Sequence, residues 1–469
     1  MTGRIRRGFR RAAAGLAVFW LAGCDLAPPY HGPGGVAVPA RYKDGGIWSP
    51  SAPADRESRG AWWRVFRDPT LDALEARLLR GNATLAEAVA RRDAALGALR
   101  TAASALYPQV DLGANATRGH SLFFGDEHDA AGGPGLTYEV DLWGAVANSV
   151  RAARDEARAT REDLASVQLS LSAQLAEAYF SLRGADADLA LLRETETAYR
   201  AAEDLTRKLY AGGAASEIDL DRAETQAADA AAQRGEAEAA RAQYENAIAD
   251  LLGENAAGFH LASMTLAGVP PAVPVGTPST LLQRRPDIAA AERRVAMANA
   301  RVGIARAALY PSLTLSASAV YEAVWGTMLH ATEFVWALGP GVVNLPLFDA
   351  GRREGQVDQS LAALRGAAAA YRQTVLDAFR DVADQMALAN RLADAATAED
   401  RAAGAADRAL ALALVQYKDG AVDYLQVVVA QTADLAARSQ VIDLRRRRYL
   451  AAVDLVRALG GGWQAADSG

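Results

Sequence analysis

The chain has 469 residues, 51% of them hydrophobic, and a formal net charge of −6 at pH 7. Its 56 acidic residues outnumber the 50 basic ones, which argues against nucleic acid as a partner. The single Cys excludes a disulfide within the chain, and the five His residues show no metal-ligand spacing. We therefore expect neither a metal site nor a cofactor.

The first 23 residues have the features of an export signal. Arg residues crowd the first 11 positions, and an apolar run then leads to Leu21-Ala22-Gly23-Cys24. This ending is similar to a bacterial lipobox, which implies that residues 1–23 are removed and that Cys24 is lipidated. A chance Cys after an ordinary signal peptide is the alternative. In some bacteria an Asp directly after the lipobox Cys, here Asp25, retains a lipoprotein in the inner membrane.

Residues 24–61 are rich in Pro and Gly and predict an extended tether. The first structural repeat, 62–257, then begins. Asp68 is suited to cap a helix whose first residue is Pro69, and the helical pattern continues past Gly81-Asn82 to Ala105. Tyr107-Pro108 ends this helix, because Pro lacks an amide donor and disfavours helix just before itself.

The hydrophobic period then changes from 3.6 to 2, which predicts a β-hairpin over 108–143. Each strand has the length of a tilted transmembrane strand, with one apolar face and one polar face. A hairpin of a soluble sandwich is the alternative. We expect residues 118–134 to form a solvated loop, since its His and acidic residues suit solvent better than a metal site. The alternating apolar residues are Val110, Leu112, Ala114, Ala116, Leu136, Tyr138, Val140 and Leu142.

The next stretch predicts a long helical hairpin over 145–252. Ala145 to Leu209 contains no Pro, and its Leu residues mostly follow three-four spacing, as in a coiled coil. Tyr210 to Gly213 breaks the pattern. Ser216 to Asp219 then predicts a capping box for the returning helix.

Residues 258–280 form a Pro-rich linker to a second structural repeat, 281–463, and 464–469 form a C-terminal tail. The landmarks of the first half recur about 205 residues later, which indicates a tandem duplication. The second repeat predicts a β-hairpin over 311–346, with its partner strand from Val335 to Leu345, and a helical hairpin over 350–459. The recurring landmarks are Leu106-Tyr107-Pro108 with Leu309-Tyr310-Pro311, Tyr210 and Gly213 with Tyr417 and Gly420, and Leu252-Gly253 with Leu459-Gly460. Tyr321, Trp325 and Trp336 suit an outer aromatic belt or, alternatively, a buried core.

These residues carry a resemblance to a known family. Leu282 to Ile288, reading LQRRPDI, followed by Ala291-Glu292 and Ala300 to Ala305, resembles the signature of TolC-like outer-membrane efflux proteins of the NodT lipoprotein type. The resemblance covers almost everything after Cys24. It implies a mainly α fold with a membrane β-barrel part. Duplicated helical hairpins would form a periplasmic α-barrel, and four transmembrane strands per chain would close as a twelve-stranded barrel in a homotrimer.

The resemblance also implies a function. The chain would be the outer-membrane channel of a tripartite efflux system, passing drugs and toxic organic molecules outward from a periplasmic adaptor and an inner-membrane pump of the resistance-nodulation-division type. It would be lipid-anchored in the outer membrane and extend into the periplasm. No reaction on the substrate is implied, so we expect no enzyme.

The same resemblance suggests roles for particular residues. Asp423, with Asp419 nearby, matches a place where some relatives narrow the pore with Asp; a simple helix cap is the alternative for Asp423. Gly213 and Gly420 are candidates for adaptor contact, with plain turn glycines as the alternative. We expect a structural role for the signature residues, which are Arg284, Arg285, Pro286 and Asp287.

Two other classes of protein are weighed against the channel. A lipid-anchored periplasmic adaptor also contains a coiled-coil hairpin, but it carries one between small β domains, whereas this sequence predicts two hairpins and amphipathic strand pairs. An enzyme is disfavoured because the sequence shows no convergent set of His, Ser and carboxylate residues.

Overall fold

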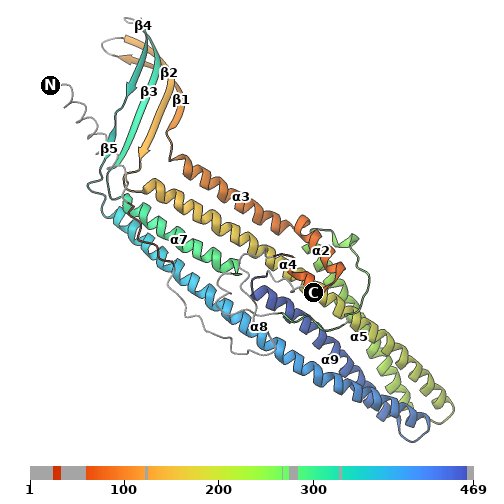
Figure 1. Cartoon of the computed structure of the whole chain (residues 1–469). Helices are drawn as coiled ribbons and strands as arrows, with labels where there is room; N and C mark the ends of the chain where they lie inside the picture. The colour runs from red at the N-terminus through yellow and green to blue at the C-terminus, as the bar shows by residue number, and fades with distance from the viewer. Residues whose placement is uncertain are drawn as a thin grey trace. The chain divides into compact units, whose positions relative to one another are not determined.

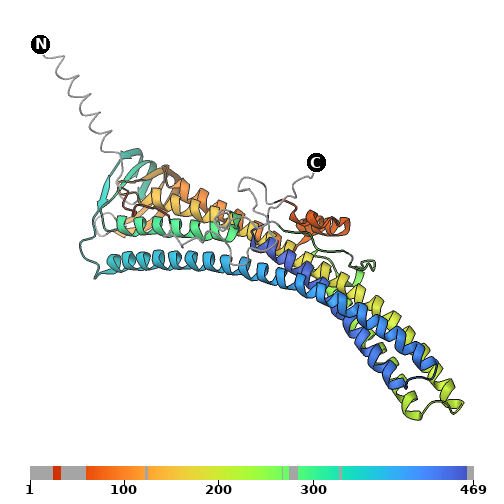
Figure 2. The same ribbon diagram turned by 60° about the horizontal axis from the view of Figure 1, so that its bottom comes forward.

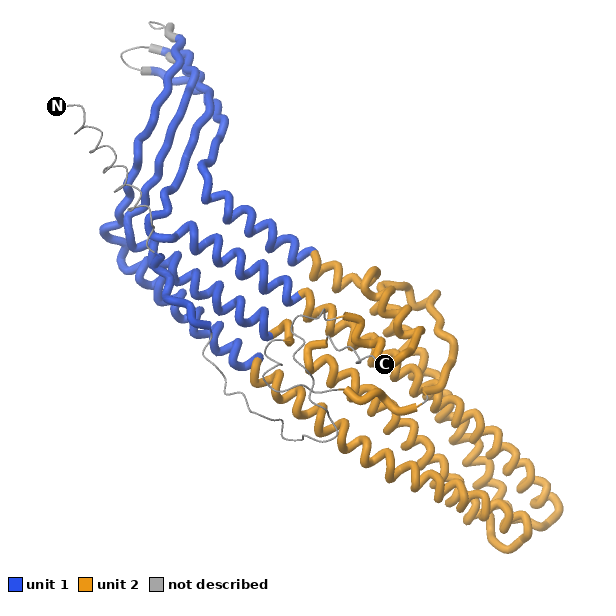
Figure 3. Tube along the Cα trace, in the orientation of Figure 1, with its two compact units in different colours: residues 1–35, 90–163, 288–374 blue, residues 36–89, 164–287, 375–469 orange. Residues whose placement is uncertain are grey.

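A computed structural model describes residues 25–32, 60–121, 125–266, 268–273, 284–326 and 330–461. The predicted signal peptide with Cys24, most of the tether and the C-terminal tail lie outside these residues. The chain divides into two compact units, coloured in Figure 3. Unit 1 contains residues 1–35, 90–163 and 288–374, and unit 2 contains 36–89, 164–287 and 375–469. Each unit therefore combines segments from both halves of the sequence.

Three pairs of helices, labelled in Figure 1, have members of equal length. The two members of each pair come from the two halves of the chain, as a tandem duplication predicts. The pairs are α3 (Ala83–Ser104) with α7 (Pro286–Ala307) at 22 residues, α4 (Ala145–Ala211) with α8 (Arg352–Lys418) at 67, and α5 (Glu217–Leu251) with α9 (Tyr424–Ala458) at 35. Within the described residues, no helix combines the length and apolar character needed to cross a membrane.

The first helix is shorter than the sequence indicates. A 3-10 turn, η1 (Trp62–Phe66), precedes α2 (Pro69–Gly81), and the Asp68 carboxylate accepts hydrogen bonds from the backbone amides of Thr70 and Leu71, as predicted. The prediction of one continuous helix past Gly81-Asn82 is wrong. Asn82 is extended, with φ −69° and ψ 123°, and separates α2 from α3.

The break at Asn82 has a physical cause. The Asn82 side chain accepts from the amide of Leu85 at 2.8 Å, which caps α3, and donates to the carbonyl of Leu251 at 2.7 Å. A Cβ at Gly81 would lie 2.4 Å from the Leu252 carbonyl oxygen, so the backbones of α2 and the end of α5 approach closely here. The tertiary contact and the cap together outweigh the local helical pattern.

Unit 1 contains one antiparallel sheet (Figure 1). Its strands are β1 (Gln109–Ser121), β2 (Gly125–Val140), β3 (Ser312–Gly326), β4 (His330–Leu338) and β5 (Val342–Asn344). The order is β1-β2-β3-β4, and β5 also pairs with β3. The single partner strand predicted over Val335–Leu345 is therefore wrong in its bounds. It is split by the Gly339-Pro340 dipeptide, because Pro lacks the amide donor that a sheet requires.

The predicted loop over 118–134 is also wrong. The β1–β2 ladder continues through Arg118 paired with His128 and on to Ser121 paired with Gly125. The polar composition of this stretch suggested a loop, but paired backbones satisfy their hydrogen bonds whatever the side chains. β2 approaches β3 closely at Gly133, since a Cβ there would be 1.9 Å from the Ala319 carbonyl oxygen.

The pairing register places apolar rows from all four strand positions on one face of the sheet. Residues directly opposite each other in a ladder point to the same face. Val110 pairs with Leu136, and Leu136 pairs in turn with Ala317. Ala317 pairs with Leu338, so the row crosses all four strand positions. The next rows on this face contain Leu112 with Pro134, Ala319 with Trp336, and Tyr321 with Phe334. Rows of the opposite face contain Asp111, Thr137, Ser316 and Glu322.

Unit 2 is built on the two helical hairpins. Figures 1 and 2 show α5 returning beside α4 and α9 beside α8, with both turns at the same end of this unit. The seam predicted in α4 is buried over most of its length, and its buried members include Leu171, Leu175, Leu182, Leu189 and Tyr199. The Tyr199 hydroxyl also donates to the Gln431 carbonyl at 3.0 Å, which joins α4 to α9.

A buried ion network ties α4 and α5 to the start of the linker. Asp186 is 1% exposed. Its carboxylate accepts from Arg183 at 2.9 Å and Arg241 at 2.7 Å, and also from the Ser263 hydroxyl and the Met264 amide, both at 3.1 Å. Both guanidinium groups continue to linker carbonyls, Arg183 to Ala262 and Arg241 to Leu261, each at 2.7 Å. The start of the linker is thus bound by Arg183, Asp186 and Arg241, and all of these contacts lie within unit 2.

Candidate functional site: the hairpin turns and the amphipathic sheet

The turns of the two helical hairpins have the same backbone design. Gly213 and Gly420 follow the long helices with positive φ angles of 76° and 71°, values that favour glycine. A Cβ added at either position would meet no atom within 4 Å, so both turns face open space. The glycines are therefore turn residues, and they are also open to contact from outside the chain.

The residue that caps the returning helix differs between the two turns. In the first hairpin Ser216 and Asp219 form the predicted capping box. In the second, Asp423 occupies the equivalent place, three residues after the glycine, and its carboxylate accepts from the Gln426 amide at 3.2 Å. This hydrogen bond is the contact that the helix-cap alternative for Asp423 requires. The cap leaves the carboxylate exposed, and Asp419 in the same turn is exposed as well.

The turns also expose apolar side chains. Tyr424 is buried against Ala223 and Val427 and anchors the second turn on α5. Outside this anchor, large apolar residues close to both turns face solvent in the monomer. They are Tyr210, Ile218, Leu412, Val415, Leu425 and Val429, with Ile218 62% and Leu412 63% exposed. Exposed apolar groups beside polar turns are typical of a surface that binds another protein.

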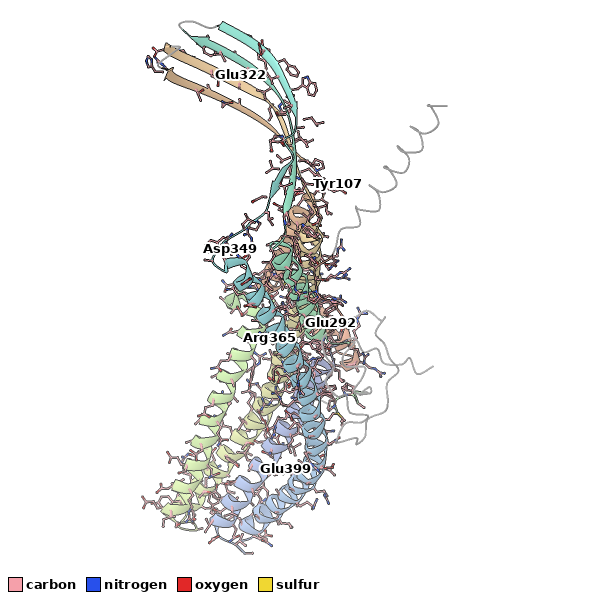
Figure 4. All side chains as sticks on the ribbon, turned by 90° about the vertical axis from the view of Figure 1, so that its left-hand side faces the viewer. Tyr107, Glu292, Glu322, Asp349, Arg365 and Glu399 are labelled. Carbon is pink, nitrogen blue, oxygen red and sulfur yellow. The ribbon has the colours of Figure 1, made fainter. Side chains whose placement is uncertain are left out.

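In unit 1 the apolar face of the sheet is uncovered. Trp336 is 72% and Tyr321 58% exposed, and Trp325 is also exposed, which excludes the buried-core alternative for these aromatic residues in the isolated chain. Figure 4 shows Glu322 within the sheet and Tyr107 at the end where the helical segments begin. Among the described residues, β1 and β4 each have one edge without a strand partner. An exposed apolar face with open edges is not stable in water as a monomer.

The signature arginines lie at the start of α7 and have structural contacts in unit 2. Arg285 binds Asp287 through two nitrogens, at 2.7 and 3.1 Å, and reaches Asp381 at 3.3 Å and the Ala458 carbonyl at 3.0 Å. Burial alone would lower the pKa of Arg285, but these carboxylates raise it. Arg284 is buried. These contacts join the first residues of the second repeat to its last helix.

Several residues with defined contacts were not anticipated from the sequence. They belong to no recognisable motif, because each acquires its partners only through the fold. These residues are Asp186 with Arg183 and Arg241, the buried Glu75, and Asn148 with Asp25. In the part of the chain that the structure describes, no His, Cys, Asp and Glu residues are grouped so as to hold a metal ion.

These features define a class of protein. Long helical hairpins, turns open to a partner, and a sheet with an uncovered apolar face are typical of an envelope protein that enters a membrane through strands. Comparison with known proteins gives the family. The family model described as "Outer membrane efflux protein" matches residues 74–254 and 277–461, so the chain belongs to this family. It is an outer-membrane efflux protein that extends into the periplasm.

Individual relatives agree along nearly the full length. The toluene efflux pump outer membrane protein TtgF of Pseudomonas putida is 32% identical, with 94% of this chain and 95% of TtgF covered. The cation efflux system protein CusC of Escherichia coli is 30% identical, with 95% and 97% covered. The solved outer-membrane channel OprN superposes with a TM-score of 0.84 at 28% identity, covering 94% of this chain and all of OprN.

Proposed function

We propose that the chain works as a lipid-anchored homotrimer and forms the outer-membrane conduit of a tripartite efflux system. Three copies of the four-position sheet would close a twelve-stranded barrel in the lipid bilayer, and three pairs of helical hairpins would form a periplasmic α-barrel. An adaptor protein would engage the hairpin turns and connect them to an inner-membrane pump of the resistance-nodulation-division type. The substrate passes through without chemical change, and the chain has no catalytic role.

The observation that carries this proposal is the sheet. Its apolar face runs across all four strand positions, and β1 and β4 are open on one side within the described residues. In lipid an unpaired strand edge costs several kcal/mol for each unsatisfied group, so a spanning sheet must close. Four positions are too few to close around a pore, whereas three copies supply enough strands.

The first prediction concerns membrane location and assembly. We expect the full-length protein to fractionate with the outer membrane and, after extraction in mild detergent, to have about three chain masses by native mass spectrometry. Palmitate or another acyl chain should be attached to the N-terminal Cys24 of the mature chain. A Cys24→Ser variant lacks the acyl chains and controls for anchoring. Monomeric protein in the inner membrane would instead support a lipid-anchored adaptor.

The second prediction concerns the pore. In a trimer, Asp423 and Asp419 would each occur three times around the axis, and rings of acidic groups favour cations. The variant Asp423→Asn keeps a good helix cap and removes only the charge. We expect it to lower the cation-to-anion permeability ratio roughly two- to tenfold in planar bilayers at low salt. The matched control is Asp219→Asn, which removes an acidic group from the other turn. Equal permeability ratios for the parent protein, Asp423→Asn and Asp219→Asn would contradict a gate at Asp423.

The hairpin turns are the proposed adaptor surface, with Gly213 and Gly420 at their centres. The exposed apolar residues near both turns and the open space at the two glycines support this role. For the substrate we propose small organic molecules, because a chain with five Met and one Cys is poor in the thiolate and thioether ligands that soft metal cations prefer. Export of toluene but not of soft metal cations from a sensitised strain supports this choice, and the reverse result would contradict it.

A further inference from the structure

Unit 2 contains a cavity lined by residues of η1, α2 and α4, which is separate from the hairpin turns and the sheet. It encloses about 480 Å³, a volume within the range of sites for small organic molecules. Figure 1 shows α2 beside α4. The lining residues that carry the argument are Trp62, Trp63, Arg64, Asp72, Leu79 and Leu169.

The walls of this cavity are held by contacts within the fold. The rings of Trp62 and Trp63 pack edge to face, with their centroids 6.0 Å apart. At the start of α2, the Asp68 carboxylate accepts a hydrogen bond from the Tyr179 hydroxyl of α4 at 2.5 Å. The cavity is therefore preformed, and a ligand would bind without first ordering its walls.

Two polar atoms of the lining residues have no partner. Trp62 is 2% exposed, and its indole Nε1 is buried without an acceptor among the described residues. The Oδ1 atom of Asp72 is likewise buried, and no donor reaches it from the described part of the chain. A buried donor or acceptor that stays unpaired is costly. A ligand that brings both an acceptor and a donor into the cavity would satisfy the two atoms together.

The charged residues of the lining point to the charges of that ligand. Arg64 and Asp72 carry opposite charges, yet within the described ranges neither side chain forms an ion pair. Glu75, close to Asp72 on α2, adds little negative charge at pH 7, because burial raises its pKa to about 8. The lining thus offers one unpaired cation and one unpaired carboxylate.

The donors and acceptors are sorted in the same way as the charges. The Trp62 indole and the Arg64 guanidinium can only donate, whereas an ionised Asp72 can only accept. Donors beside a cationic group suit a carboxylate, and a carboxylate acceptor suits an ammonium group. Trp63, Leu79 and Leu169 add apolar lining, which suits a hydrocarbon or aromatic body.

We propose that this cavity binds a zwitterionic organic molecule with an apolar body, of the kind represented by a free apolar amino acid. The ligand carboxylate accepts from Arg64 and from the Trp62 Nε1, and the ligand ammonium donates to the Asp72 Oδ1. The apolar body lies against Trp63 and Leu169. This binding site is a property of unit 2, and it does not depend on conduction through the proposed conduit.

The third prediction tests the cavity with L-phenylalanine as the probe, by equilibrium dialysis against the full-length protein in lipid nanodiscs. Arg64→Gln and Asp72→Asn should each raise the Kd roughly tenfold, because each removes one charge-assisted hydrogen bond. Arg80→Gln, at an exposed position of α2, and Asp204→Asn, at an exposed position of α4, are the matched controls. Both controls should bind the probe as the parent protein does.

Two analogues of the probe give a sharper criterion. Phenethylamine lacks the carboxylate and 3-phenylpropanoate lacks the ammonium, so the parent protein should bind each roughly tenfold more weakly than L-phenylalanine. Asp72→Asn should weaken phenethylamine further and leave 3-phenylpropanoate unchanged. Arg64→Gln should have the opposite pattern. L-Leucyl-L-phenylalanine distinguishes the sources of such a ligand, since tighter binding of this dipeptide supports the site with a peptide as its occupant.

Three results would overturn the proposal. The first is the absence of saturable L-phenylalanine binding by the parent protein up to about 10 mM. The second is an equal Kd for the parent protein, Arg64→Gln and Asp72→Asn, with circular dichroism showing that both variants are folded. The third is equal affinity of the parent protein for L-phenylalanine and its two analogues, a comparison that needs no variant.

Discussion

Replacing Asp186 with alanine is expected to lower the free energy of unfolding by about 3–5 kcal/mol, the range for breaking a buried ion pair by removing one partner. Arg183 is 2% exposed, and in the variant its guanidinium would lose its buried carboxylate. Arg241 would lose the same partner and keep Glu245 at 3.0 Å. The linker residues Ser263 and Met264 would each lose an acceptor.

The effect is measured by thermal unfolding in detergent, followed by circular dichroism at 222 nm. Asp186→Asn retains the shape and an acceptor oxygen, so we expect an intermediate loss. The matched control is Asp204→Ala on the same helix, whose carboxylate is 68% exposed and 3.5 Å from Arg207. Such surface pairs contribute about 0–1 kcal/mol. A change in Asp186→Ala no larger than in this control would show that the network does not stabilise the fold.

Replacing Glu75 with glutamine is expected to stabilise the protein, increasingly so as the pH rises from about 4.5 to 8. Glu75 on α2 is fully buried. Burial raises its pKa from 4.5 to about 8, a hydrogen bond from the Ser172 hydroxyl at 2.5 Å opposes this, and repulsion from Asp72 adds to it. Its Oε1 has no hydrogen-bond partner among the described residues.

The sign follows from proton linkage. Between pH 4.5 and 8 the unfolded chain has released the Glu75 proton while the folded chain retains it, so stability falls as pH rises, by at most about 1.4 kcal/mol per pH unit. Glutamine carries no such proton. Melting temperatures of the two proteins should therefore coincide near pH 4 and separate progressively to pH 8.

Two other buried carboxyl groups have raised pKa values, about 7 for Glu177 and about 6 for Asp188. Both are present in the parent protein and in Glu75→Gln, so their effects cancel in the difference between the two melting temperatures. Glu236→Gln, at an exposed position of α5, is the control. A constant difference across this pH range would show that Glu75 ionises normally in the folded protein.

The periodic parts of the fold could be predicted from the sequence, and the tertiary contacts could not. The helix caps at Asp68 and Ser216 were predictable, because each is a hydrogen bond to a backbone amide only two or three residues away. Asn82 ends a helix because its side-chain amide donates a hydrogen bond to the carbonyl of Leu251, which is far away in the sequence. No local sequence pattern predicts this contact. The polar ends of β1 and β2 resembled a loop because the ladder there is held by backbone bonds.

The same distinction applies to the candidate site. The two turn glycines follow from a break in periodicity, and their positive φ angles confirm that they are turns. For Asp423 the sequence left two roles open, a pore-narrowing residue and a helix cap. The hydrogen bond that its carboxylate accepts from the Gln426 amide is the contact expected of a helix cap. The contacts of Asp25 with Asn148 and Arg151 were not predicted, because a Pro-rich segment gives no sign of the helix face that receives it.

The equal lengths of the paired helices constrain how such a chain can change in evolution. The turns after α4 and α8 lie at the same end of unit 2, and both helices have 67 residues. Deleting one heptad from α4 alone would withdraw its turn by about 10 Å and leave the turn after α8 protruding. Insertions and deletions in these helices are tolerable only as matched events in both halves, so the duplicated halves must keep a common length while their sequences diverge.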